Sequence, residues 1–349
     1  MNRLHLDKVA SVTRNLQLER TVTVVPDVIA EAGAVVAGRI INEKSAYNQL
    51  EDVFGRMNVL HGGDVIVGAL GHRNALHGYE GVLPTSVVAG QMLQVLNLGG
   101  VIGECVSHNP DVGAPFQFEV LGQVLVYPEF GSRQGRAANI AQRAVRGGGQ
   151  LPRCPVIYVA GTCMNSGKTA AASAIVRRLR QAGLRVGGLK LTGISLMKDT
   201  LAMGDYGADA VLDFTDAGIV CTSADTAAAT AHILFAEMAA RGVDVIVAET
   251  GDGIMGEYGV QSILADPVLA GLRTAFVFCA NDPVGVSGGL RDLRESFGID
   301  ADLVTGPATD NRVGTRFVES LGVPAINART DPKRVGDFVL DLIEARRGA

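Results

Sequence analysis

The sequence has no tryptophan and few other aromatic residues, which together make up 5% of the chain. Glycine is abundant instead, with 44 residues. Because glycine adopts backbone angles that other residues avoid, this balance favours tight turns and close backbone contacts over a binding surface built from aromatic rings. Composition alone does not identify a function.

Long apolar runs are also missing, although 47% of the 349 residues are hydrophobic. No run reaches the ~18–20 residues that a membrane-spanning helix needs. The first residues, MNRLHLDKVASVTRN, contain no apolar core of the ~7–15 residues found in secretion signals. We therefore expect no membrane partner and a cytoplasmic location.

Clusters of positive charge are absent, and the net charge is −5. The lysines and arginines are scattered, so the basic patch of a nucleic-acid-binding protein is missing, and we expect no nucleic-acid partner. The five cysteines form no CxxC pair, which is typical of reduced thiols in a cytosolic protein.

The patterns that are present divide the chain into two halves. From Val22 to Tyr127, short apolar runs such as DVIVGAL and FQFEVLGQVLVY alternate with period two and predict β-strands. The segment RAANIAQRAV predicts one short helix, and the glycines at 147–149 indicate a linker. We predict a β-rich domain over residues 1–149, a small barrel or sandwich, and a second domain over residues 150–349.

The second half alternates apolar runs such as VIYVAG, VDVIVAET and TAFVFCAND with helical stretches such as AAASAIVRRLRQAG. Continuous apolar runs belong to strands that are buried on both faces. The predicted fold class is therefore α/β, with a mostly parallel sheet flanked by helices, preceded by the β-rich domain. Ligands bind at the carboxyl ends of such strands.

A phosphate-binding motif follows the first of these strands. The string GTCMNSGKT fits G-x-x-x-x-G-K-[ST], with an apolar strand before it and a helix after it. Backbone amides of such a loop and the positive end of the helix bind phosphate oxygens. A chance Gly-Lys-Thr turn is the alternative, and it would not need both flanks. The predicted phosphate-binding residues are Gly161, Thr162, Cys163, Met164, Asn165, Ser166, Gly167, Lys168 and Thr169.

Within this loop, Lys168 is expected to reach the β- and γ-phosphates, and the hydroxyl of Thr169 is suited to Mg²⁺. Acidic residues near strand ends extend the prediction. Glu249 ends a strand in VDVIVAETGDG, with Asp252 three residues later, and such a carboxylate can complete a Mg²⁺ shell or polarise a water. A carboxylate here can also merely cap the next segment.

Asp199 and Asp205 follow an earlier strand end, and either could approach the Mg²⁺. Spacing does not choose between them, and a plain surface role is the alternative for both. Lys190 lies at the end of GLKLTG, where it could steady a substrate carboxylate or the γ-phosphate. A solvated lysine at a strand exit is the other interpretation.

Two asparagines follow late strands. Asn281 comes after TAFVFC and Asn311 after ADLVTG, in polar turns that suit the edge of a purine, so both are candidate base-binding residues. Asparagine also dominates ordinary turns, which is an equally good interpretation for each.

Taken together, GTCMNSGKT, GLKLTG and VIVAETGDG resemble the P-loop branch that contains dethiobiotin synthetase and the molybdopterin-guanine dinucleotide accessory protein. The resemblance covers roughly residues 155–340. It implies ATP and Mg²⁺ as cofactors, and it places Lys168, Thr169, Lys190 and Glu249 on the ATP, Mg²⁺ and substrate positions.

The layout of the whole chain is similar to that of a poorly characterised family that includes a D-glutamate N-acetyltransferase. The sequence departs from that family's pattern in the middle of the loop, at residues 164–166, and in the region after Glu249. Neither the substrate nor the reaction is therefore carried over.

The N-terminal half has a polar cluster of its own in GGDVIVGALGHRNALHGYEGVLP. Its histidine spacing gives no helical metal face, and Cys105 with His108 lacks a second pair, so zinc is disfavoured. We expect Arg73 and His72 to contact an anionic substrate or the nucleotide. An interaction or oligomerisation module, giving a homo-oligomer, is an equal alternative.

Three functions fit these patterns. The first is an ATP- and Mg²⁺-dependent ligase or kinase, in which Lys168, Lys190 and Glu249 promote phosphoryl transfer to a small anionic metabolite. The second is a nucleotide-hydrolysing switch or accessory protein for cofactor assembly. The third is an acyl-CoA-dependent N-acyltransferase whose P-loop holds the donor's phosphates. The strand-end lysine suits a small anion and favours the first.

Overall fold

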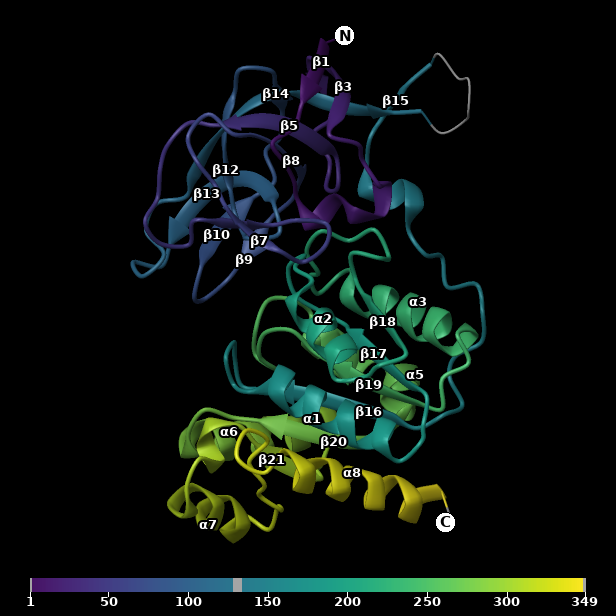
Figure 1. Cartoon of the computed structure of the whole chain (residues 1–349). Helices are drawn as coiled ribbons and strands as arrows, with labels where there is room; N and C mark the ends of the chain where they lie inside the picture. Colours follow the sequence, from purple (N-terminus) through teal and green to yellow (C-terminus); the bar gives the residue numbers. More distant parts are fainter. Residues whose placement is uncertain (1, 128–133, 348–349) are drawn as a thin grey trace. The chain divides into compact units, whose positions relative to one another are not determined.

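The computed structural model describes residues 2–127 and 134–347, and the chain divides into two compact units (Figure 1). Unit 1 comprises Met1–Val145, Ile194–Met197 and Thr215–Cys221. Unit 2 comprises Arg146–Gly193, Lys198–Phe214 and Thr222–Ala349. Two short segments from the second half of the sequence therefore belong to unit 1, which the sequence pattern does not predict.

Unit 1 is built from short strands, as its period-two pattern predicts. They are β1 (Asn2–His5), β2 (Lys8–Val9), β3 (Thr21–Val25), β4 (Asp27–Val28), β5 (Val35–Ile40), β6 (Gln49–Glu51), β7 (Met57–Val59), β8 (Val65–Leu70), β9 (Arg73–Asn74), β10 (Tyr79–Val82), β11 (Val87–Val88), β12 (Met92–Val95), β13 (Val101–His108), β14 (Phe116–Val126) and β15 (Arg136–Ala137). The 3-10 helices η1 (Ser11–Leu16) and η2 (Ile140–Arg143) belong to the same unit.

Some of these strands pair in a closed ring. β5 pairs with β8 and β14, β8 pairs with β13, and β12 closes the ring by pairing with both β13 and β14. The result is a small barrel whose core contains fully buried side chains such as Val35, Val67 and Phe118. A Cβ at Gly38 of β5 would lie 2.3 Å from the Phe118 ring, so only glycine lets the strand pack this closely.

Unit 2 alternates strands and helices. Its strands are β16 (Val156–Gly161), β17 (Val186–Lys190), β18 (Ala210–Asp213), β19 (Val245–Glu249), β20 (Arg273–Cys279) and β21 (Leu303–Thr305). Its helices are α1 (Lys168–Gln181), α2 (Lys198–Asp205), α3 (Ala227–Ala240), α4 (Val260–Ala265), α5 (Pro267–Gly271), α6 (Pro283–Phe297), η3 (Pro307–Thr309), α7 (Arg312–Ser320) and α8 (Pro332–Arg347).

The strands of unit 2 form one six-stranded parallel sheet in the order β18-β17-β19-β16-β20-β21. Helices α1 and α8 pack together over one face, on Val159 and Val277. On the other face, Tyr158 contacts Phe235 of α3 and donates a hydrogen bond to the Leu269 carbonyl of α5. The predicted α/β fold class, with its β-rich N-terminal part, is confirmed.

Because the strands of this sheet run in one direction, their carboxyl ends meet at one edge. β19 lies between β17 and β16, so the segments that follow these strands are neighbours at that edge (Figure 1). The strand order therefore decides which polar residues come together.

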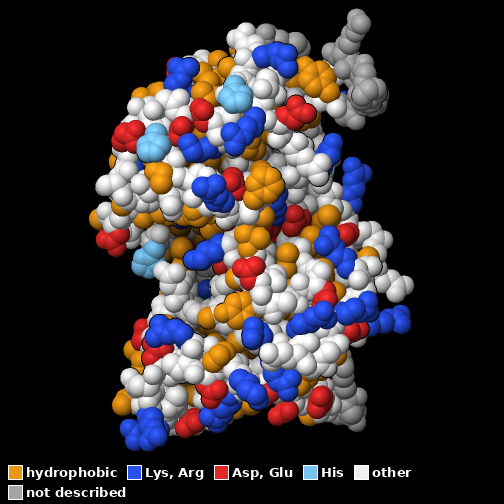
Figure 2. Space-filling view, in the orientation of Figure 1, with side chains coloured by type: hydrophobic (Ala, Val, Ile, Leu, Met, Phe, Trp, Pro, Cys, Tyr) orange, Lys and Arg blue, Asp and Glu red, His pale blue; other side chains and the backbone are white. Residues whose placement is uncertain are grey.

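The surface of unit 2 carries exposed ion pairs, such as Arg294 with Asp300 and Arg185 with Asp244. Acidic and basic side chains are intermingled on the face shown in Figure 2. Such pairs contribute little to stability, because water and salt screen them.

The five cysteines are all free thiols, and Cys221 and Cys279 are buried. Among the helices formed by residues 2–127 and 134–347, none combines the length and the apolar character that crossing a membrane requires.

Candidate functional site

The loop between β16 and α1 has a geometry that its glycines make possible. Asn165 and Gly167 adopt left-handed backbone angles, with φ of 61° and 93°, so the loop turns sharply just before α1. A Cβ at Gly161 would lie 2.4 Å from the hydroxyl oxygen of Ser166, which is too close for any residue other than glycine. Residues 161–169 are called the P-loop from here on.

Lys168, the first residue of α1, is held inside the P-loop. Its side chain is buried, and its ammonium donates to the Cys163 carbonyl at 2.7 Å and to Ser166 Oγ at 3.3 Å. Burial and the nearby Lys190 ammonium lower the pKa of Lys168 below its usual value. The P-loop thus carries a positive group where the N-terminus of α1 adds the positive end of its dipole.

The strand order brings further charged residues beside the P-loop. Glu249 at the end of β19 is opposite Lys190 at the end of β17 and pairs on its other side with Val159 of β16. Asp199 lies in the first turn of α2. One ammonium and two carboxylates therefore meet next to Thr169.

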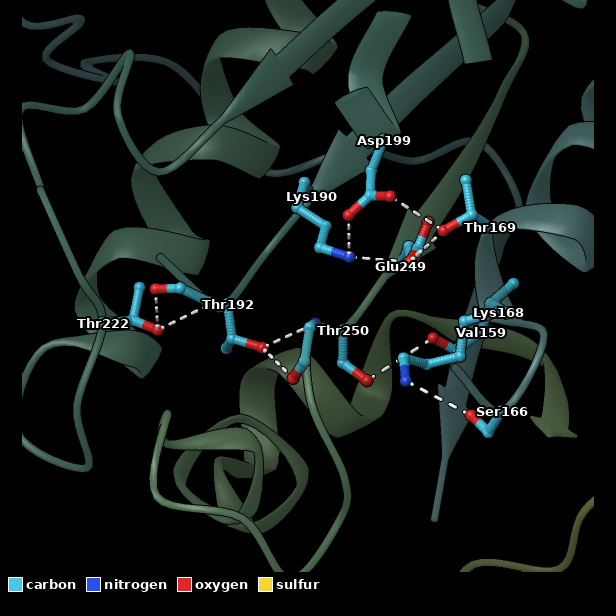
Figure 3. A network of polar contacts seen from close by, with 12 residues as sticks. Val159, Ser166, Lys168, Thr169, Lys190, Thr192, Asp199, Thr222, Glu249 and Thr250 are labelled. Atoms are coloured by element: carbon cyan, nitrogen blue, oxygen red, sulfur yellow. Dashed lines mark hydrogen bonds and ion pairs between the residues drawn. The ribbon is translucent and has the colours of Figure 1, made fainter. Parts of the chain in front are cut away.

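Figure 3 shows how these side chains converge. The Lys190 ammonium lies 2.6 Å from Asp199 Oδ2 and 2.6 Å from Glu249 Oε1. The Thr169 hydroxyl lies 2.9 Å from Asp199 Oδ1 and 3.1 Å from Glu249 Oε1, and it can donate to one of them at a time. Glu249 Oε2 is buried and has no hydrogen-bond partner among the described residues. We call Thr169, Lys190, Asp199 and Glu249 the strand-end cluster.

The charges of the strand-end cluster are unevenly balanced. Burial alone would lower the pKa of Lys190, but the two carboxylates outweigh it and raise this pKa. Burial tends to raise the pKa of Asp199, but Lys190 and Thr169 hold it below its usual value. Burial raises the pKa of Glu249, and Lys190 offsets only part of the rise. One ammonium faces two carboxylates, so a second cation would be favourable here.

No family model matches the sequence, and no curated protein matches it. Among solved structures, the chain is similar to an LAO/AO transport system kinase, at 18% identity and a TM-score of 0.37, over 57% of this chain and 62% of that one. It is also similar to chloroplast FtsY from Physcomitrella patens, at 13% identity and a TM-score of 0.36, over 53% of this chain and 62% of that one.

A third similar structure is the signal recognition particle 54 kDa protein from Aeropyrum pernix in complex with GDP, at 15% identity and a TM-score of 0.36. That match covers 58% of this chain and 52% of the other. The chain thus spans less than two thirds of each of these structures. Likenesses at this level carry no argument about function, which has to rest on the site itself.

Asp205 is not brought into the strand-end cluster. It is the last residue of α2 and is exposed, whereas Asp199 lies in the first turn of the same helix. The spacing of the two residues in the sequence could not separate them, because the position of the helix decides which one faces Thr169.

The two asparagines predicted to bind a base lie in different surroundings. Asn281 is close to the P-loop, where its amide nitrogen donates to Cys163 Sγ at 3.1 Å. Asn311 is the N-cap of α7, and its side-chain oxygen accepts from the amides of Val313 and Gly314 at 2.9 and 3.2 Å. The side-chain oxygen of Asn311 therefore caps a helix, which is the structural role expected of an asparagine in a turn. Base binding by either residue stays a prediction.

The turn after β21, predicted from the sequence only as a polar turn that leads to Asn311, packs against the P-loop. Gly306 follows β21, and a Cβ there would lie 2.2 Å from the Ser166 carbonyl oxygen. The buried Asn327 fixes this turn, because its amide nitrogen donates to Thr309 Oγ1 at 3.1 Å and to Asp310 Oδ1 at 2.8 Å. The sequence indicates the turn but gives no signal for the contacts of Asn327, because these form only in the folded chain.

In unit 1, Arg73 of β9 is buried. Its guanidinium donates to Tyr47 Oη at 3.0 Å and lies over the rings of Tyr47 and Tyr79, 5.5 and 5.7 Å from their centroids. Through these contacts, Arg73 takes part in the packing of unit 1. The expected contact of Arg73 and His72 with an anionic ligand stays a prediction.

Proposed function

We propose that the chain binds a nucleoside triphosphate with Mg²⁺ at the P-loop and transfers the terminal phosphoryl group to a small anionic acceptor. The observation that carries this proposal is the strand-end cluster, which lies next to a P-loop with a buried lysine. A P-loop alone would account for phosphate binding, whereas the cluster supplies what metal-assisted phosphoryl transfer needs. The resemblance to dethiobiotin synthetase favours ATP as the nucleotide and a ligase or kinase as the reaction class.

The residues present fit a magnesium ion. Thr169, Asp199 and Glu249 offer oxygen atoms at one point, and Glu249 Oε2 has no partner there among the described residues. Mg²⁺ is usually held by one or two carboxylates, and phosphates and waters complete its shell. In the described part of the chain, no group of three or more His, Cys, Asp or Glu residues is placed to hold a metal by itself. This suits an ion that arrives with the nucleotide and neutralises charge on its phosphates.

Two lysines would act on the transferred group. Lys168 lies in the P-loop, and Lys190 lies at the adjacent strand end. Ammonium groups fixed in place before the reaction stabilise the negative charge on the phosphoryl oxygens, and they also favour an anionic acceptor. Lys190 neutralises the same carboxylates that fit the ion, so the binding of the ion and the position of Lys190 are coupled.

Formation of ADP from ATP and of GDP from GTP, measured with and without Mg²⁺, tests this proposal. We expect Mg²⁺-dependent turnover that falls roughly 10²–10³-fold in Lys168→Ala, because a positioned charge on the transferred group is lost. Glu249→Gln should lower turnover and raise the Mg²⁺ concentration that is needed. The control is Lys333→Ala, which removes an exposed lysine of α8. Turnover that is unchanged in Lys168→Ala would sink the proposal.

A further inference from the structure

The segment that follows β19 is fixed to two other elements. We call residues 250–256, with the sequence TGDGIMG, the Asp252 loop. The Gly251 amide donates to Thr192 Oγ1 at 2.8 Å, and the same hydroxyl donates to the Gly251 carbonyl at 2.9 Å. The Ile254 amide donates to the Gly161 carbonyl of the P-loop at 2.9 Å. The loop is therefore held both to the chain that follows β17 and to the P-loop.

The two glycines beside Asp252 make this fit possible. A Cβ at Gly251 would lie 2.0 Å from the Thr192 carbonyl oxygen, and a Cβ at Gly253 would lie 2.0 Å from the Thr162 carbonyl oxygen. Neither position has room for a side chain. Asp252 lies between these two glycines and is the only one of the three residues with a side chain. The backbone of this segment packs closely against the P-loop.

Asp252 itself has an uncommon backbone conformation. Its φ is 62°, in the left-handed region that few residues other than glycine adopt, although Asp and Asn tolerate it best. Such conformations persist where the surrounding structure fixes them, and they concentrate at functional sites. The carboxylate is half-buried, and a hydrogen bond from the Gly253 backbone acts to lower its pKa. It therefore keeps acceptor capacity beside the P-loop.

The charged groups around Asp252 are those of the proposed phosphate site. Burial raises the pKa of Asp252 above its usual value, and Glu257, just after the Asp252 loop, acts in the same direction. Lys168 of α1 and Lys190 of β17 partly oppose the rise without pairing with the carboxylate at ion-pair distance. A carboxylate that is more basic than usual and lies near two phosphate-directed lysines suits proton transfer.

We propose that Asp252 accepts the proton of the nucleophile that attacks the γ-phosphate. The nucleophile is then a water molecule, or a hydroxyl or amine group of the acceptor, since a carboxylate nucleophile carries no proton to remove. This inference rests on the proposed function and narrows its substrate class. In the step, the O–H or N–H bond of the nucleophile breaks and its proton moves to a carboxylate oxygen of Asp252. The freed electron pair forms the new bond to phosphorus, and the bond to the leaving nucleoside diphosphate breaks.

Asp252 could instead serve only as a turn residue, and two substitutions separate the two roles. Asparagine tolerates a left-handed φ as aspartate does, and glycine adopts it without backbone strain. Asp252→Asn and Asp252→Gly should therefore both fold. Neither variant can accept a proton. The control is Glu257→Gln, which removes an exposed carboxylate from the chain just after the Asp252 loop.

The test measures the formation of ADP from Mg²⁺·ATP and of GDP from Mg²⁺·GTP by the full chain, together with the Kd of each nucleotide. Both Asp252 variants should lower kcat about 10²-fold or more, the usual contribution of a general base. The Kd values should stay within about threefold, because this interaction is made only in the transition state. The wild-type kcat should fall as the pH drops through the raised pKa of Asp252, and the variants should lack this fall. Glu257→Gln should behave as the wild type.

The possible results separate this inference from the proposed function. Wild-type kcat in Asp252→Asn would overturn the role of Asp252 and leave the proposed function standing. A loss of nucleotide binding in both Asp252 variants would also overturn it, because the residue would then only support the P-loop. A wild-type protein that binds neither nucleotide in the presence of Mg²⁺ would remove the proposed function and this inference with it.

Discussion

At the scale of single residues, Lys190 places one ammonium 2.6 Å from each of two buried or half-buried carboxylates. Removing one partner from such a group leaves charge uncompensated, which costs roughly 3–5 kcal/mol. We predict a loss at the low end of this range for Lys190→Met without Mg²⁺, because Glu249 can take up a proton. Thermal unfolding should show a lower Tm than that of the wild type.

Addition of Mg²⁺ should raise the Tm of Lys190→Met more than that of the wild type, because the ion can replace the missing positive charge. Lys198→Met is the matched control, since Lys198 is an exposed lysine of the neighbouring helix α2. Equal Tm values for Lys190→Met and the wild type would contradict the account in which Lys190 compensates the charge of the two carboxylates.

The sequence predicts the strand-end residues better than the loop residues. Lys190 and Glu249 end buried strands, and parallel strands place their ends at one edge, so the pattern places both residues at the same edge of the sheet. Their direct contact depends on β17 lying beside β19. The choice between Asp199 and Asp205 needs the start of α2 at Lys198, which no pattern indicates. For Asn311 the ordinary interpretation from sequence describes the side-chain oxygen well. This oxygen caps a helix, which is the structural role expected of an asparagine in a turn.

At the scale of elements, the P-loop is braced by segments from other strands. The Asp252 loop binds the Gly161 carbonyl, and Gly306 lies against the Ser166 carbonyl. Gly306 has φ of 93° and ψ of −170°, a region that is essentially restricted to glycine. We predict that Gly306→Ala costs roughly 1–3 kcal/mol from the backbone alone. The added methyl group should also displace the P-loop and weaken the binding of Mg²⁺·ATP.

Gly288→Ala is the matched control for Gly306→Ala. Gly288 lies inside α6, and a Cβ there would meet nothing within 4 Å. Alanine in a helix interior is favoured over glycine by about 0.5–1 kcal/mol, so this variant should unfold at a slightly higher temperature. Calorimetric titration measures the binding of Mg²⁺·ATP, and circular dichroism measures thermal unfolding. Unchanged nucleotide binding in Gly306→Ala would contradict the bracing of the P-loop.

The braces themselves could not be predicted from the sequence. The Gly-Asp-Gly pattern is visible, but Thr192 and Gly161, which hold it, lie 59 and about 90 residues earlier in the chain. Contacts over such distances depend on strand order, which hydrophobic periodicity does not contain.

At the scale of the whole molecule, periodicity predicts the β-rich first half and the parallel sheet of the second half. It does not predict that residues 194–197 and 215–221 belong to unit 1. There Val220 joins the hydrophobic core, and the buried Asn97 donates to the Ser195 carbonyl at 2.6 Å. Segments this short carry no period of their own, so only the packed structure assigns them. The predicted division at residue 149 stays a prediction.

The central claim is that the P-loop and its neighbouring cluster bind a nucleoside triphosphate with Mg²⁺. Calorimetric titration of the full chain with ATP and with GTP, in the presence and absence of Mg²⁺, tests it most directly. We predict Mg²⁺-dependent binding of one or both nucleotides, weakened about tenfold or more in Lys168→Ala by the loss of a charge-assisted contact to phosphate. Binding of neither nucleotide, or equal binding by Lys168→Ala, would contradict the account.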